Sequence, residues 1–150
     1  MIVSMKQSSD HMQNYPFQKE FHIHWGDMDA LGHVNHAKYL VWFETIRCQL
    51  MSELGIEVTK ATEIGPILAN LTTNYYAPLY FPDQVKVGVA ISRVGNSSFT
   101  LEYAVARLED VDKAVCVAST VMVLFNYKTN QKVAITEELK QKMLPFMKIA

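Results

Sequence analysis

Asp27 and Asp29 lie two positions apart, between an expected strand and an expected helix. Because Asp, Gly and Asn dominate such connections, turn chemistry alone would explain the pair. A carboxylate beside the positive end of a long helix, however, also faces unpaired backbone N–H groups that can stabilise a developing oxyanion. A nucleophile or base next to an oxyanion site is what acyl transfer needs, so the segment has a structural and a catalytic interpretation.

Four histidines surround these aspartates in the sequence: His22, His24, His33 and His36. Histidines on one strand face, with a ligand from the next loop, could bind zinc. The spacing of His33 and His36 straddles the expected helix start, and neither Glu nor Cys completes a ligand pattern. We therefore expect no metal and no cofactor. The absence of GxSxG, P-loop and GxGxxG motifs argues against serine hydrolase, kinase and dinucleotide-binding functions.

The aspartate segment follows a predicted strand and precedes a predicted helix. Apolar residues alternate over residues 17–25, which is typical of a half-buried strand. Apolar residues then recur every three or four positions over residues 36–54, which predicts an amphipathic helix with Asn35 as N-cap and Gly55 after its end. The apolar side of the strand is predicted to comprise Phe17, Phe21, Ile23 and Trp25.

The rest of the chain predicts mainly strands. Residues 57–66 read as irregular, and strands are expected over 67–76, from 84, from 99 and over 115–127, in largely meandering antiparallel order. Gly95-Asn96 is expected to supply the positive φ of a tight hairpin turn. Thr136 precedes a short C-terminal helix. The sequence thus predicts an α+β domain over residues 16–150, with about five antiparallel strands wrapped around one long helix, after a flexible lead-in over residues 1–15.

Composition limits the partners and the compartment. The 150 residues include 14 Lys and Arg against 15 Asp and Glu, a net charge of −1, without a basic cluster. Nucleic acid and membrane are therefore not expected as partners, and no apolar stretch approaches the roughly 20 residues that span a bilayer. The two cysteines, Cys48 and Cys116, lack CxxC spacing and read as reduced thiols, so a cytoplasmic location is expected.

The segment from Trp25 to Arg47, WGDMDALGHVNHAKYLVWFETIR, resembles the signature of the hot-dog-fold acyl-CoA thioesterases of the 4-hydroxybenzoyl-CoA thioesterase family. Residues 76–83 (YAPLYFPD) and 94–103 (VGNSSFTLEY) extend the likeness. The resemblance implies a hot-dog fold, an acyl-CoA substrate and a homodimer or homotetramer with shared sites.

The resemblance also implies roles for individual residues. Asp29 matches the family's catalytic carboxylate, which would act as nucleophile or as general base, and helix N-terminal amides would form the oxyanion site. The backbone N–H that polarises the thioester carbonyl falls on His36, a position at which one branch of the family uses a histidine side chain. The expected substrate-binding residues are Gly32, His33, Asn35, Tyr39, Ser97 and Ser98.

Two alternatives to thioester hydrolysis share the same fold. One is a non-catalytic module that binds an acyl thioester or a protein, and the other is a hydratase. The Asp-x-Asp-x-x-Gly pattern from Asp27 to Gly32 favours hydrolysis over a silent binder. Hydratases on this fold place their Asp and His further apart, an arrangement that this sequence lacks.

Overall fold

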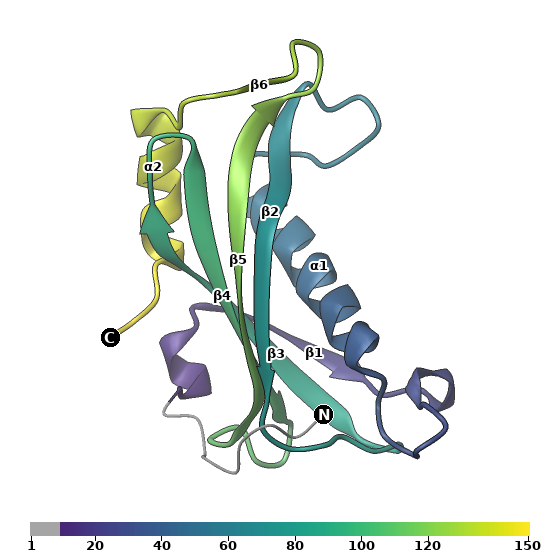
Figure 1. Cartoon of the computed structure of the whole chain (residues 1–150). Coiled ribbons are helices and arrows are strands. Elements are labelled where there is room, and N and C mark those ends of the chain that lie inside the picture. Colours follow the sequence, from purple (N-terminus) through teal and green to yellow (C-terminus); the bar gives the residue numbers. More distant parts are fainter. Residues whose placement is uncertain (1–9) are drawn as a thin grey trace.

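One curved antiparallel sheet has the strand order β1-β3-β4-β5-β2, and a two-residue strand, β6, pairs with β5 (Figure 1). The computed structural model describes residues 10–150. The elements are β1 (Phe17–His22), α1 (His36–Glu53), β2 (Ile64–Tyr75), β3 (Gln84–Val94), β4 (Ser98–Arg107), β5 (Ala114–Asn126), β6 (Gln131–Lys132) and α2 (Glu137–Met143), with short 3₁₀ turns at Met12–Asn14, Trp25–Asp27 and Leu144–Phe146.

The predicted helix ends are confirmed. The side chain of Asn35 accepts a hydrogen bond from Ala37 N–H at the start of α1, and Gly55 has φ +81° just beyond its end. At α2, Thr136 is the N-cap and accepts from Leu139 N–H. The N-cap signals of Asn35 and Thr136 and the C-terminal glycine signal of Gly55 are local, because each depends on residues within one turn of the helix end.

The apolar stripe of α1 packs on one face of the sheet (Figure 1). A polar contact adds to this packing, since Arg47 Nη1 donates to Tyr103 Oη of β4 over 3.2 Å, and that hydroxyl lies 2.9 Å from Thr120 Oγ1 of β5. The buried helix residues are Tyr39, Trp42, Phe43, Ile46, Leu50 and Met51, and their main strand partners are Val85, Val87, Val89, Ile91, Leu101 and Val105. The sheet and α1 therefore share one apolar core.

The predicted meander is right for β3, β4 and β5 and wrong for β2. Strand β2 pairs with β5, with Asn70 opposite Val121, rather than with β3. Three strand spacings, about 14 Å, separate the positions of β2 and β3 in the sheet. The eight residues 76–83 can span that width, because extended chain covers about 3.3 Å per residue.

Two further local expectations are wrong. Strand β1 ends at His22, and Trp25 begins a 3₁₀ turn with 77% of its surface exposed, so it does not join the apolar side of the strand. The β3–β4 hairpin is present, but neither Gly95 nor Asn96 has positive φ. Its three-residue connection is closed by the Gly95 N–H bond to Ser98 O, at 2.7 Å. Strand β2 also begins at Ile64, inside the stretch expected to be irregular.

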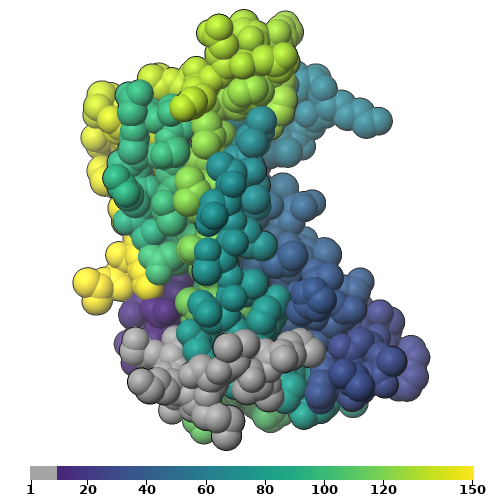
Figure 2. Space-filling view, in the orientation of Figure 1, coloured from purple at the N-terminus to yellow at the C-terminus, as the bar shows by residue number. Residues whose placement is uncertain are grey.

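Strand β2 forms one edge of the sheet, and among residues 10–150 β5 is the only strand that pairs with it. Figure 2 shows its teal residues as a continuous column on the visible face. Its 12 residues include no charged side chain, and Leu68, Asn70, Thr72 and Asn74 are exposed. Long uncharged edge strands invite pairing with another chain.

No helix formed by residues 10–150 has the length and apolar character to cross a membrane.

The packed domain begins earlier than expected at the N-terminus. Residues 1–9 of the expected lead-in lie outside the described residues, but Met12 and Tyr15 are buried on the sheet face opposite α1. They approach Gly88 of β3 so closely that an added Cβ there would lie 2.7 Å from Tyr15 Cβ. Residue 88 must therefore be glycine for this segment to pack.

We predict that Tyr15→Ala lowers the free energy of unfolding by about 3–5 kcal/mol, because it removes a buried aromatic ring and leaves a cavity. Urea denaturation measures the change. Gln13→Ala, at an exposed position of the same segment, is the control and should change stability by less than about 0.5 kcal/mol. Equal unfolding midpoints for the two variants would contradict the packing of residues 10–15.

Candidate functional site

The two aspartates before α1 have different environments. Asp27 is buried, and its Oδ2 accepts a hydrogen bond from His24 N–H at 2.8 Å. Its Oδ1 lies 3.5 Å from Lys38 Nζ, and its backbone carbonyl accepts from Asn35 N–H at 2.8 Å. Asp27 thus fixes the connection between β1 and α1, which is the structural role that turn chemistry predicts.

Asp29 is half-buried and uses only one carboxylate oxygen within its loop. Its Oδ1 accepts hydrogen bonds from Leu31 N–H at 2.9 Å and from His33 N–H at 3.3 Å. Within residues 10–150, Oδ2 has no hydrogen-bond partner. The loop therefore orients the carboxylate while leaving one oxygen available to a ligand.

The loop geometry depends on Gly32. Its φ is +80°, a conformation that costs other residues roughly 1–2 kcal/mol. This conformation lets Gly32 N–H donate to Asp29 O at 3.0 Å, while Asp29 N–H donates to His33 O at 2.8 Å. Gly32 and His33 accordingly shape the turn that holds the carboxylate.

The start of α1 presents one unpaired donor. Asn35 Oδ1 accepts from Ala37 N–H at 2.9 Å, and Asn35 O accepts from Lys38 N–H at 2.9 Å. The His36 N–H has no partner in the described part of the chain, and the His36 side chain is exposed. Asn35 is thus a helix cap, and the amide expected to polarise a thioester carbonyl is free to do so.

A cavity of about 270 Å³ opens beside this loop. Among the described residues, its lining consists of Leu31, His33 and Val34 from the loop, Tyr39 from α1, and Tyr75, Ala77 and Pro78 from the end of β2 and the residues after it. Two of the predicted substrate-binding residues, His33 and Tyr39, therefore line one cavity.

Ser97 and Ser98 lie elsewhere. Ser97 lies in the β3–β4 turn and Ser98 begins β4, at the opposite end of the sheet from the loop before α1 (Figure 1). Ser97 O accepts from Leu124 N–H at 2.8 Å, and Asn96 O accepts from Ile135 N–H at 2.7 Å. A role for these serines in the same site would require a second copy of the chain.

Tyr75 also lines the cavity, and the sequence did not indicate it as a site residue. Its hydroxyl donates to the backbone carbonyl of His36 over 3.1 Å, and its ring packs edge-on against Tyr39 with centroids 5.0 Å apart. Burial raises the pKa of the Tyr75 phenol, so the hydroxyl stays protonated and able to donate at neutral pH. Tyr75 is 39 residues from His36, so no local pattern could have indicated this contact.

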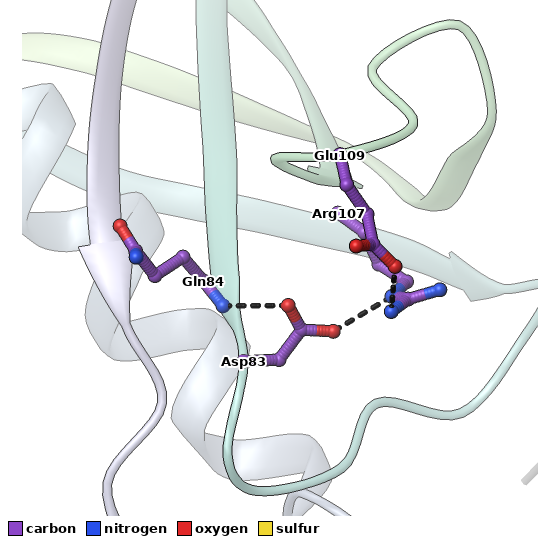
Figure 3. A network of polar contacts seen from close by, with 4 residues as sticks. All are labelled: Asp83, Gln84, Arg107 and Glu109. Atoms are coloured by element: carbon purple, nitrogen blue, oxygen red, sulfur yellow. Dashed lines mark hydrogen bonds and ion pairs between the residues drawn. The ribbon is translucent and has the colours of Figure 1, made fainter.

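A polar network holds the segment that follows β2. Asp83 Oδ1 accepts from Gln84 N–H at 2.8 Å, its Oδ2 accepts from Arg107 Nε at 2.7 Å, and Arg107 also pairs with Glu109 (Figure 3). Asp83 O accepts from Ile23 N–H at 2.9 Å. The network joins the beginning of β3 to the turn after β4, and it borders a second cavity of about 620 Å³.

The other candidate chemistries find little support. Within residues 10–150, no three His, Cys, Asp or Glu side chains form a group that could hold a metal ion. His22 and His24 are exposed, and His33 packs edge-on against Tyr80 at 5.4 Å. Burial raises the pKa of the Cys116 thiol to about 12, so it is not a thiolate at neutral pH.

The different environments of the aspartates predict losses of stability of different size. Asp27→Ala should lower the free energy of unfolding by about 1–3 kcal/mol, because it removes a buried carboxylate that accepts from His24 N–H and pairs with Lys38. Asp29→Ala should cost less, since water can replace its more exposed contacts. Urea denaturation of both variants checks the order. A larger loss for Asp29→Ala would show that Asp29, not Asp27, fixes the loop.

Comparison with known proteins identifies a superfamily. Residues 23–143 match the model of the thioesterase-like superfamily. The chain is 24% identical over 132 residues to the long-chain acyl-CoA thioesterase FadM of Escherichia coli, covering 87% of this chain and 99% of that protein.

Two further proteins are similar. The 1,4-dihydroxy-2-naphthoyl-CoA hydrolase of Crocosphaera subtropica is 23% identical over 122 residues, which cover 79% of this chain and 89% of the hydrolase. The crystal structure of the PA5185 protein of Pseudomonas aeruginosa superposes with a TM-score of 0.84 at 26% identity, over 93% of this chain and 97% of that one. Because the superfamily model spans most of the sequence, the chain belongs to the thioesterase-like superfamily.

Proposed function

We propose that the protein is a thioester hydrolase that converts an acyl-CoA to the free acid and CoA. One observation carries the proposal: the loop before α1 holds the Asp29 carboxylate by one oxygen, and within residues 10–150 neither its other oxygen nor the nearby N–H of His36 has a partner. A group that attacks and a donor that stabilises the resulting oxyanion are the two parts that thioester hydrolysis requires.

The reaction has two possible courses from this arrangement. Asp29 Oδ2 would remove a proton from water, which attacks the carbonyl carbon, or it would attack that carbon itself and form an anhydride that water then cleaves. In both courses the carbonyl oxygen gains negative charge, which the His36 N–H and the positive end of α1 stabilise. The C–S bond then breaks, and the CoA thiolate takes up a proton.

The main alternative is a module that binds acyl thioesters without hydrolysing them. Such a module needs the cavity but not an oriented carboxylate. The orientation of Asp29 favours hydrolysis, because two backbone N–H groups, of Leu31 and His33, hold its carboxylate by Oδ1, and a binding module has no need of a carboxylate held in this way. Release of free thiol from a panel of acyl-CoAs distinguishes the two functions.

We also propose that the functional unit is a homodimer or a larger homo-oligomer. Strand β2 offers 12 uncharged residues at the edge of the sheet, interrupted by one register shift between Leu68 and Asn70, and natural monomers usually protect such a long edge with charges. A second copy paired along β2 would continue the sheet. In such a dimer, Ser97 and Ser98 would contribute to a site only if the β3–β4 turn of one subunit reached the Asp29 loop of the other.

Light scattering tests the role of β2. Thr72→Lys places a charge at the exposed edge and should shift the mass from dimer or tetramer towards monomer, whereas Thr129→Lys in the β5–β6 turn should leave it unchanged. A monomeric wild-type protein would contradict the proposed oligomer.

We predict that Asp29→Asn lowers kcat/KM for acyl-CoA hydrolysis by at least about 10²-fold, because an amide neither attacks a carbonyl nor removes a proton at a useful rate. Asp27→Asn is the matched control and should retain most activity if the protein stays folded, since its oxygen can still accept from His24 N–H. An inactive Asp27→Asn with a fully active Asp29→Asn would reverse the assignment.

The role of His36 is tested by His36→Asn, which keeps the backbone N–H and suits a helix start. If only the amide acts, as the exposed side chain suggests, the variant should retain most activity, and its pH–rate profile should coincide with that of the wild type. A rate loss of about 10²-fold, with loss of a limb near neutral pH, would show instead that the imidazole takes part.

A further inference from the structure

We infer that the cavity beside Asp29 receives the acyl group, that this group is compact and uncharged, and that Tyr75 determines its size. The inference rests on the proposed thioester hydrolysis and extends it by naming the substrate class. It favours a single aromatic ring or a short aliphatic chain over a long acyl chain.

The position of the cavity connects it to the proposed chemistry. Leu31 and His33, which line it, are the two residues whose N–H groups bind Asp29 Oδ1. Tyr39, which also lines it, is three positions after His36 in α1. The cavity therefore adjoins both the loop that holds the proposed carboxylate and the first turn of α1, where the acyl group of a bound thioester would enter.

The size of the cavity limits its occupant. Pockets that enclose drug-sized ligands measure roughly 300–1,000 Å³, and this one measures about 270 Å³. A cavity just below that range suits a benzoyl or hexanoyl group better than a palmitoyl chain.

Aromatic packing closes the wall formed by α1 and β2. Tyr39 is 2% exposed and packs against Trp42, with ring centroids 5.2 Å apart, and Tyr75 meets Tyr39 edge-on. The Tyr75 hydroxyl is tied to His36 O, so its ring cannot turn aside without losing that bond. A longer acyl chain would have to displace this ring.

The chemistry of the lining indicates an uncharged acyl group. The described lining includes no Asp, Glu, Lys or Arg, and Leu31, Val34 and Pro78 give it apolar surface. A second carboxylate on the acyl group would lose its hydration there without gaining an ionic partner. Ring edges from two tyrosines suit an aromatic acyl group, which gains from edge-to-face contact.

The experiment measures kcat/KM of the full-length protein for benzoyl-, hexanoyl-, lauroyl- and palmitoyl-CoA, below the concentrations at which the long-chain substrates form micelles. The wild type should prefer benzoyl- and hexanoyl-CoA over palmitoyl-CoA by about tenfold or more, which is the discrimination that small steric differences provide. Tyr75→Ala should shift the preference towards lauroyl- and palmitoyl-CoA.

Three variants separate cavity size from general damage. Tyr75→Phe keeps the ring and should keep the order of preference, while it lowers kcat/KM for all four substrates alike by loosening the His36 contact. Tyr127→Phe is the matched control, because it removes a tyrosine bond to a backbone carbonyl, that of Pro66, outside this cavity, and it should behave as the wild type. Ala77→Leu narrows the cavity and leaves Tyr75 intact. It should reduce benzoyl-CoA turnover more than hexanoyl-CoA turnover, because a rigid ring is wider than a flexible aliphatic chain.

The outcomes distinguish the inference from the function on which it rests. Hydrolysis of all four substrates without a size preference, or an unchanged preference in both Tyr75→Ala and Ala77→Leu, would overturn the inference and leave thioester hydrolysis standing. Failure to hydrolyse any of the four would overturn the inference directly, and would overturn the proposed function if a wider acyl-CoA panel also released no thiol. Should Tyr75→Ala fail to fold, Ala77→Leu and the wild-type series still decide the question.

Discussion

The position of the first turn of α1 is the constraint on which the candidate site depends. Three hydrogen bonds from separate parts of the chain fix it: Asn35 N–H to Asp27 O, Val34 N–H to Leu79 O, and Tyr75 Oη to His36 O, at 2.8, 2.9 and 3.1 Å. Because they come from different segments, the helix start cannot shift without breaking contacts on more than one side. This fixed turn keeps the His36 amide and the Asp29 loop in one arrangement, as an electrostatic site requires.

The two aspartates divide structure and chemistry between them. Asp27 gives both carboxylate oxygens to the protein, one to His24 N–H and one to Lys38, and is buried. In Asp29, Oδ1 accepts hydrogen bonds from its own loop, and Oδ2 has no partner among residues 10–150. The structural carboxylate of Asp27 and the proposed catalytic carboxylate of Asp29 thus flank Met28. Met28 itself forms an isolated antiparallel β-bridge with Val34. Local turn chemistry and proposed catalysis are therefore adjacent parts of one loop.

Local signals in the sequence predicted local structure well. Asn35, Gly55 and Thr136 mark helix ends through contacts within a few residues, and those ends are where the sequence placed them. The alternation of apolar residues in β3 and β4 predicted these strands, because one face of each is buried against α1. The exposed position of Trp25 was not predictable, since the alternation continues past the point at which the 3₁₀ turn redirects the chain.

Features that depend on distant pairing were harder to predict. The placement of β2 beside β5 is decided by the whole sheet, and the residues of β2 give no indication of their partner. The contact between Tyr75 and His36 depends on the pairing of β2 with β5. Because the sequence did not predict that pairing, it did not predict the contact either. The packing of Tyr15 against Gly88 is of the same kind, because a glycine within an alternating strand does not reveal which side chain will cover it.

The most direct test is a crystal structure of the protein with a non-hydrolysable acyl-CoA analogue, in which a methylene group replaces the thioester sulfur. The account predicts that the carbonyl oxygen of the analogue lies about 3 Å from the His36 N–H, with the Asp29 carboxylate facing the carbonyl carbon directly or through one water. A carbonyl bound elsewhere, with Asp29 Oδ2 and the His36 N–H both facing solvent, would contradict it.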